Sequence, residues 1–291
     1  MKLRRRVSAV DFTEDMMPST RRAVFKDVMS LHWFDLLKLG LLLLAAILPV
    51  IVMSITADAY EARIYSALAD PAADEALFAA RADAVSFRNT TALVSIPLYM
   101  LFNVVLAGAI RLIRQYAWEE VAFFWGDLGK GIKQNWKQYI AVGLLMGAQN
   151  AIGSYLTGYG VINQQKALII AGGIFRGIAW IIIFPVCAYM LVQISVYGNT
   201  FRQNFRVGSA LFAKSPVKTI AVLLAVCAVT AISLIPNFIC HIAGYAFGAL
   251  LAPYTMLVWF LFTSAQLDKY INPTHFPELV GRGMRKNDNG Q

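Results

Sequence analysis

Charged residues are scarce in this chain of 291 residues, and their scarcity excludes an ordinary soluble domain. Asp, Glu, Lys and Arg make up 15% of the sequence, whereas hydrophobic residues make up 58%. Average soluble domains contain about 25% charged residues. A soluble fold of this composition would expose much of its apolar surface to water. We therefore expect an all-α, polytopic transmembrane helical bundle whose apolar side chains are solvated by lipid.

Cysteine and histidine are also rare, and neither occurs in a metal-binding pattern. The cysteines at 187, 227 and 240 form no CxxC pair, and the histidines show no HxxxH or HExxH spacing. These patterns exclude a disulfide framework and the common zinc motifs. Glu119 and Glu120 are adjacent, so on a helix they point about 100° apart and cannot face each other as an acid–base pair. We expect no enzyme activity, no metal and no cofactor.

Long stretches with almost no Asp, Glu, Lys or Arg indicate the membrane spans. A helix needs about 20 apolar residues to cross the hydrocarbon core. The last stretch runs from Thr219 to Leu267, which is too long for one span, and Pro236, Asn237 and His241 divide it. The six predicted spans are residues 33–57, 89–113, 138–158, 174–197, 217–237 and 242–265. They are flanked by an N-terminal segment (1–32), an outer loop (58–88) and a C-terminal tail (266–291).

Lys and Arg are distributed unevenly between the connections, and this predicts the orientation. Eight precede residue 39, five lie in 111–137, four lie in 198–218 and four follow residue 266. The alternate connections contain three, one and none, with Arg176 left aside. Cytoplasmic loops carry the excess of Lys and Arg. Both termini are therefore expected in the cytoplasm. The outer loop 58–88, with six acids against three bases, is either a solvated linker with short helices broken at Pro71 or a cap that binds a partner.

Two cytoplasmic segments, 117–137 and 199–215, combine aromatic and basic residues at helical spacing. In the first, Phe124, Leu128, Ile132 and Trp136 recur every four residues, which is typical of one helix face. We expect both segments to form amphipathic helices that lie in the membrane interface. The residues that we expect to contact the interface or a partner protein are Phe124, Trp125, Lys133, Trp136, Lys137, Arg202 and Arg206.

Polar residues inside the predicted spans are the candidates for a solute path. Arg176 is either an intramembrane cation, which would be costly and functional, or an interfacial residue whose side chain reaches water. We favour the interfacial position, because no acidic residue lies within a span to pair with it. Amide side chains in spans commonly form hydrogen bonds between helices, but together they could also line a cavity for a polar solute. The candidate solute-lining residues are Arg176, Gln149, Asn150, Asn103 and Gln193.

Two stretches of the sequence are similar to a known family. The stretch AGAIRLIRQYAWEEVAFFWGDLGKGIKQNWKQYIAVGLLMG contains a K-x-N-(F/W)-K-Q run, formed by residues 133–138. With the later stretch PVCAYMLVQISVYGNTFRQNFRVGSALFAKSPVKT, it resembles the YesL-like family of bacterial integral membrane proteins. The biochemical activity of that family is unknown, and its members often lie beside genes for carbohydrate uptake and breakdown. The outer loop here is long for the family.

The resemblance implies an accessory or scaffold protein of a bacterial cell membrane, which acts with other membrane proteins of a sugar uptake system. We expect no nucleic-acid partner, because the charges lie in short clusters between long apolar runs and do not form a nucleic-acid groove. The alternative is a small-solute transporter or channel with its own path through the bundle. A weaker alternative is the permease subunit of an ATP-binding-cassette importer. Glu120, Ala122 and Gly126 match the first half of the E-A-A-x3-G pattern of such permeases, with Val121 in place of an Ala, but the second half of the pattern does not match.

Overall fold

The computed structural model describes residues 17–67, 74–235 and 238–285, and within these ranges all regular structure is helical. This confirms the all-α class. The principal helices are α1 (Arg21–Ala67), α2 (Asp74–Ala117), α3 (Phe124–Ile162), α4 (Lys166–Ile178), α5 (Phe184–Val196), α6 (Phe201–Lys214), α7 (Pro216–Val226) and α8 (Phe238–Tyr270). The shorter elements are the π-helical turn η2 (Ala179–Ile183), the 3-10 turns η3 (Thr230–Leu234) and η4 (Pro277–Leu279), and α9 (Asn272–His275).

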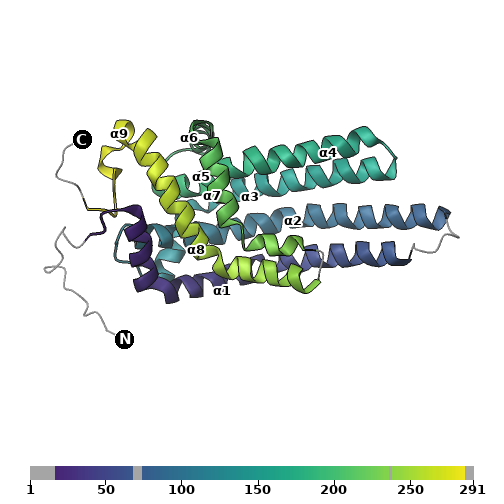
Figure 1. The fold of residues 1–291 in the computed structure, drawn as a ribbon, viewed down its shortest axis with the longest axis horizontal. Helices are drawn as coiled ribbons and strands as arrows, with labels where there is room; N and C mark the ends of the chain where they lie inside the picture. The colour runs from purple at the N-terminus through teal and green to yellow at the C-terminus, as the bar shows by residue number, and fades with distance from the viewer. Residues whose placement is uncertain (1–16, 68–73, 236–237, 286–291) are drawn as a thin grey trace.

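The long helices run antiparallel along one axis of the molecule (Figure 1). The α1–α2 and α3–α4 hairpins turn at the same end, which we call the hairpin end. Both chain termini, α6 and α9 lie at the opposite end, which we call the terminal end. Helix α2 packs most extensively on α3, while α8 returns to the terminal end against α1 and α2.

Four helical stretches are long and apolar enough to cross a membrane, rather than the six predicted: Arg21–Tyr60, Ala79–Ala117, Lys166–Val196 and Ile242–Tyr270. A fifth is possible if α6 and α7, which meet at 101°, form one broken span. Helix α3 does not qualify although it is 39 residues long, because polar residues such as Gln149 and Asn150 lower its hydropathy. Helix α7 has only 11 residues, so the segment 217–237 is not one helix. Pro236 and Asn237 lie outside the described residues.

Two predicted connections are also replaced by continuous helix. The segment 117–137 is not a separate interfacial helix, because α3 begins at Phe124 and continues through the predicted third span. Leu128 of its aromatic stripe is buried, with its backbone and side chain close to Gly108 of α2, so the middle of the stripe faces the bundle, whereas Trp136 at its end is exposed. The outer loop 58–88 is mostly helical, because α1 extends to Ala67 and α2 begins at Asp74. Pro71 lies outside the described residues.

Helix α6 occupies the predicted segment 199–215, and local sequence explains both of its ends. At its start the Thr200 hydroxyl accepts the Gln203 N–H at 3.4 Å, while the Gln203 side chain accepts the Thr200 N–H at 2.8 Å. This reciprocal pair is a capping box. At its end Pro216 lacks the N–H that would continue the helix, so the chain bends and α7 begins there.

Glycines allow the helices to approach closely. A Cβ on Gly143 would lie 2.8 Å from both the Met100 Cα and the Tyr99 carbonyl oxygen of α2. One turn later, a Cβ on Gly147 would lie 3.0 Å from the Ile96 Cα. Small residues four apart commonly form the contact between membrane helices, because they let backbones pack directly. The α2–α3 pair is therefore held by backbone contact along this face.

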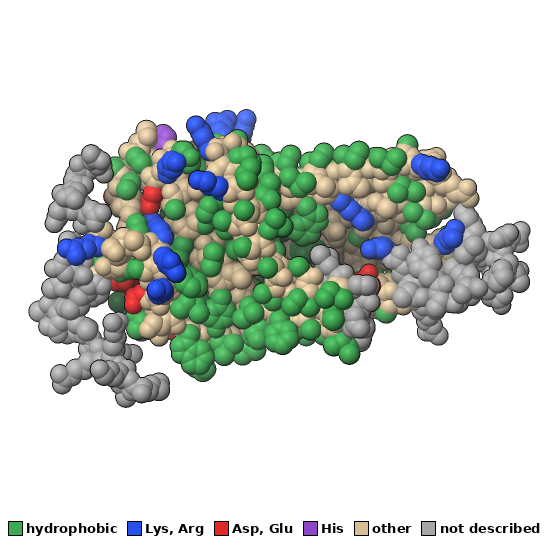
Figure 2. All heavy atoms as spheres, in the orientation of Figure 1, with side chains coloured by type: hydrophobic (Ala, Val, Ile, Leu, Met, Phe, Trp, Pro, Cys, Tyr) green, Lys and Arg blue, Asp and Glu red, His purple; other side chains and the backbone are tan. Residues whose placement is uncertain are grey.

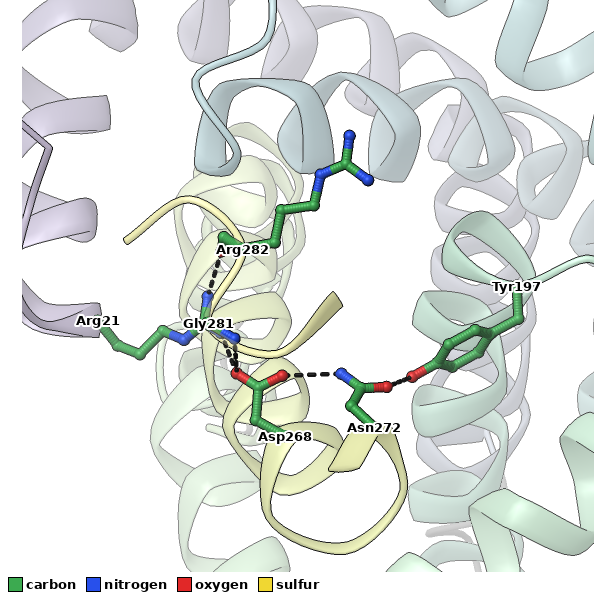
Figure 3. Close-up of polar contacts among 6 residues, drawn as sticks. All are labelled: Arg21, Tyr197, Asp268, Asn272, Gly281 and Arg282. Carbon is green, nitrogen blue, oxygen red and sulfur yellow. Dashed lines mark hydrogen bonds and ion pairs between the residues drawn. The ribbon is translucent and has the colours of Figure 1, made fainter. Parts of the chain in front are cut away.

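The chain ends are joined by a set of polar contacts that we call the terminal clasp, formed by Arg21, Tyr197, Asp268, Asn272, Gly281 and Arg282 (Figure 3). Arg21 pairs with Asp268 and donates to the Arg282 carbonyl oxygen at 3.2 Å. Asp268 also accepts the Asn272 side-chain amide at 2.8 Å and the Gly281 N–H at 3.3 Å. The clasp fixes the start of α1 to the end of α8 and to the tail.

Apolar side chains cover the middle of the molecule on the face shown in Figure 2, while Lys and Arg gather at the terminal end. The most apolar window of Lys166–Val196 is only 11% buried, and those of the other three stretches are 33% buried. Most of these apolar side chains therefore point outward. This surface is compatible with a lipid environment and unfavourable in water.

Candidate functional site

A polar pocket, which we call the outer pocket, lies among the helices toward the hairpin end. Its volume is about 320 Å³, within the range of small-molecule sites. Every long helix of the bundle contributes to its wall, and most of the lining side chains are polar or charged. Its lining residues are Met53, Ser54, Ala57, Asp58, Arg88, Thr91, Ala92, Ser95, Tyr99, Asn150, Ser154, Arg176, Trp180 and Tyr245.

Two arginines from different helices meet at this pocket. Arg88 comes from α2 and Arg176 from α4, and the Arg176 guanidinium donates to the Ser154 hydroxyl of α3 at 3.2 Å. The Nε of Arg176 is buried and has no hydrogen-bond partner in the described part of the chain. Figure 2 shows Lys and Arg side chains beside the recessed surface below the α3–α4 hairpin. Among the described lining residues, two arginines stand against one carboxylate, that of Asp58.

A π-helical turn between α4 and α5 forms part of the wall of this pocket. Helix α4 continues through η2 into α5, and η2 begins three residues after Arg176. Pro185 has no N–H to donate to the preceding turn, which favours the wider π-helical turn at this point. Trp180 of η2 lines the outer pocket. Such π-helical turns occur frequently at functional sites.

A smaller side pocket of about 110 Å³ adjoins the outer pocket and shares Arg88, Ser154 and Arg176 with it. Its remaining wall comes from α2 and α3, including Asn89 and Thr157. Arg88 and Arg176 therefore lie in the wall that the two pockets share.

A third hollow, the central cavity, lies further toward the terminal end, between α2, α3, α5, α7 and α8. Its volume is also about 320 Å³, and its wall is almost entirely apolar. Tyr99 lines both the central cavity and the outer pocket. The larger side chains around the central cavity are those of Phe102, Leu106, Met146, Phe184, Trp259 and Phe260.

The structure brings together only some of the predicted solute-lining residues. Arg176 and Asn150 share the outer pocket, whereas Asn103 lines the central cavity. Asn103 donates to the Tyr99 carbonyl oxygen at 2.9 Å, but its own Oδ1 is buried and accepts no hydrogen bond from the described residues. Gln149 and Gln193 line neither hollow. Both amide atoms of the fully buried Gln193 lack a partner among those residues.

The residues predicted to contact the interface or a partner all lie near the terminal end. Trp125 is 70% exposed, beside Val121 at 81% and Phe123 at 72%. Phe124 is partly buried, with the Lys38 ammonium 5.8 Å from its ring centre. The remaining candidates, Lys133, Trp136, Lys137, Arg202 and Arg206, are exposed. The exposed aromatic surface is therefore formed by the α2–α3 connection and the first turn of α3.

Two carboxylates near this surface have shifted pKa values. Burial alone would raise the pKa of Asp127, but hydrogen bonds from the Phe123 N–H and Gln115, together with Lys130, outweigh burial and lower it. The Phe123 N–H lies 2.8 Å from Asp127 and the Lys130 ammonium 3.5 Å. Burial and the neighbouring Asp27 raise the pKa of Glu119. Asp127 stabilises the start of α3, whereas Glu119 lies beside the like charge of Asp27. Neither residue lines the outer pocket.

No family model, no curated protein and no solved structure matches this chain. The resemblance to the YesL-like family therefore stays a prediction. Among the described residues, no three His, Cys, Asp or Glu side chains gather in a group that could bind a metal ion.

Sequence reasoning missed most of the outer pocket. In the sequence Arg88 directly precedes the apolar stretch that begins at Asn89, which predicts a place in the outer loop. In the structure α2 is continuous through this point, and Arg88 lines the outer pocket. Its helical spacing from Thr91, Ser95 and Tyr99 was the signal that could have revealed one polar helix face. Tyr245 of α8 reaches the pocket only through the tertiary fold, so no local pattern indicated it.

Proposed function

We propose that this protein is an integral protein of a bacterial cell membrane, with its hairpin end outside and its terminal end in the cytoplasm. The outward-facing apolar helices support residence in lipid. The concentration of Lys and Arg near the terminal end supports the orientation, because such residues are retained on the cytoplasmic side. We also propose that α3 crosses the membrane despite its polar residues and that α6–α7 forms a broken span. These two crossings would bring the total to six.

Reporter fusions at three positions test this topology. A fusion in the α3–α4 turn at residues 163–165 should report the outside, whereas a fusion after residue 285 should report the cytoplasm. A fusion in the α2–α3 connection, which precedes both sites in the sequence, should report the cytoplasm as well. Finding the α3–α4 turn and the tail on the same side would contradict the arrangement.

We further propose that the protein binds a small anionic molecule in the outer pocket, as a transporter or binding protein with its own solute site. The observation that carries this proposal is the pair of arginines, Arg88 and Arg176, that line one pocket from separate helices. Cations within membrane helices are costly and usually mark ligand or ion sites. Arginine suits phosphate and carboxylate groups because its planar guanidinium can donate two parallel hydrogen bonds.

Thermal unfolding of the purified protein in mild detergent tests this binding. Inorganic phosphate and glycerol 3-phosphate should raise the unfolding temperature of the wild-type chain, because a ligand that binds only the folded state stabilises it. Arg176→Gln should abolish most of that rise. Arg81→Gln is the matched control, because Arg81 is an exposed arginine of α2 that does not line the pocket. Equal stabilisation of wild type and Arg176→Gln would refute the proposal.

A second function, an accessory role beside a sugar uptake system, is favoured by the exposed surface formed by Val121, Phe123 and Trp125. Aromatic residues are enriched at protein–protein interfaces. The test is affinity purification from native membranes with a tag on the tail. Trp125→Ala should lower the recovery of subunits of a sugar importer, whereas Tyr159→Ala, an exposed aromatic residue near the hairpin end, should not. Recovery of the wild-type protein alone would contradict this role.

A further inference from the structure

We propose that the outer pocket and the central cavity together bind one single-chain lipid phosphate. The anionic head group lies at Arg88 and Arg176, and the hydrocarbon chain extends into the central cavity. This inference rests on the proposed binding of an anion in the outer pocket, and it names the class of that anion. The observation behind it is that a cationic hollow and an apolar hollow adjoin along α2, with Tyr99 in the wall of both.

The central cavity has the chemistry of a site for a hydrocarbon chain. Its wall is formed by apolar and aromatic side chains, and its volume is about 320 Å³. The hollow is partly open rather than enclosed, so its apolar wall is accessible to a hydrocarbon chain, whose contact with that wall is favourable. Apolar cavities of roughly 150 Å³ stay dry and accept small hydrocarbons. A hydrocarbon chain is therefore a better occupant than water or a sugar.

Polar groups are placed where the head and the chain of such a lipid would join. Asn103 lies one turn after Tyr99 on α2 and donates to the Tyr99 carbonyl oxygen. Its Oδ1 accepts no hydrogen bond from any described residue; this atom is itself buried, so Asn103 lines the hollow mainly through its apolar atoms. A free hydroxyl on the glycerol backbone of a single-chain phospholipid would supply the missing donor once the Asn103 amide turns toward the hollow. A double-chain lipid has an ester at this position and no hydroxyl to donate.

The direction of the two hollows also suits a lipid taken from the outer leaflet. The outer pocket is formed by the parts of α1 and α2 nearer the hairpin end, including Asp58 and Arg88. The central cavity is formed by later residues of α2, such as Leu106 and Ile113, which lie nearer the terminal end. With the hairpin end outside, the head group lies at the outer side and the chain points toward the middle of the bilayer, as in the lipid leaflet itself.

The experiment uses the full-length protein in a nonionic detergent and three probes: lysophosphatidylglycerol, lysophosphatidylcholine of the same chain length, and glycerol 3-phosphate. Binding is measured by thermal unfolding and by native mass spectrometry. Because the two lipids share a chain, their partition into detergent is the same, and any difference reports the head group. We expect wild type to bind lysophosphatidylglycerol at least about tenfold more tightly than lysophosphatidylcholine, as hydrogen bonds to a charged group predict.

Two variants separate the head site from the chain site. Arg176→Gln should weaken lysophosphatidylglycerol and glycerol 3-phosphate by about tenfold each. Ala252→Leu fills part of the central cavity, and should weaken lysophosphatidylglycerol about tenfold while glycerol 3-phosphate binds as before. Ala171→Leu, on the exposed surface of α4, is the matched control and should change neither. Unfolding without any probe confirms that each variant is folded.

The outcomes distinguish this inference from the function on which it rests. If Arg176→Gln weakens both anionic probes but Ala252→Leu leaves lysophosphatidylglycerol unchanged, the site binds a small anion and the lipid inference is wrong. If both lipids bind wild type equally and independently of Arg176, the head-group site is wrong, and the proposed function fails with the inference. Binding of none of the three probes overturns both.

Discussion

Replacement of Gly143 by alanine tests whether backbone contact holds α2 against α3. The added Cβ would lie 2.8 Å from the Met100 Cα and from the Tyr99 carbonyl oxygen, closer than van der Waals contact allows. Both neighbours are backbone atoms, so neither can rotate aside and the helices must separate. Overpacking of this kind costs about 1–3 kcal/mol. Alanine recovers about 0.5–1 kcal/mol through its better helix propensity, which leaves a net loss of about 0–2.5 kcal/mol.

Gly129→Ala is the matched control, because Gly129 lies in the same helix and an added Cβ there would have no atom within 4 Å. Only the gain in helix propensity applies there, about 0.5–1 kcal/mol. A protein of 150–250 residues shifts its unfolding temperature by about 2–4 °C per kcal/mol. Thermal unfolding in detergent, followed by circular dichroism at the helix band, should therefore show opposite shifts for the two variants. A rise for Gly143→Ala equal to that for Gly129→Ala would refute the close packing of α2 on α3.

Three further predictions concern the terminal end. Glu119 has a φ of 55° beside Asp27, so Glu119→Gly should raise the unfolding temperature by relieving about 1 kcal/mol of backbone strain, and Glu119→Ala should not. Asp268→Asn removes the charge that Arg21 contacts, and should cost about 1.5–3 kcal/mol and make the tail an early site of limited proteolysis. Since the pKa of Asp127 is lowered in the fold, its stabilising contribution is present above its unfolded value of about 3.9 and is lost as the pH falls through the lower folded value. A pH series from 6 to 3 should show a loss of stability in wild type that is smaller in Asp127→Asn.

The helical class and the outward apolar surface followed from the sequence because both depend on composition and on short-range periodicity. The number of spans did not follow. Hydropathy marks a stretch without charges, such as the one that begins at Thr219, but does not show that α7 ends at Val226. Helix propensity likewise could not distinguish a solvated loop that begins at residue 58 from the extension of α1 to Ala67. In both cases composition and hydropathy do not fix where the helix ends.

The candidate site could be predicted only where the chemistry of a single residue was unusual. Arg176 is a candidate from the sequence alone, because a cation within an apolar stretch is costly and often functional. Its partner Arg88 is the same residue type at the edge of a stretch, where arginine is ordinary. Gln193 looked equivalent to Asn150 in the sequence, yet it is buried on another part of the bundle. The direction in which each helix face points, and not the residue type, decided which amides line the outer pocket.

The terminal clasp has a consequence for biogenesis. Arg21 and Asp268 are separated by 247 positions, so under the proposed membrane residence α1 is synthesised and inserted long before its counter-charge has been made. At roughly 5–20 residues per second, the interval is on the order of tens of seconds. During that interval the start of α1 lacks this contact. A chain that ends before Asp268 would leave Arg21 without its carboxylate and the start of α1 without its tie to α8.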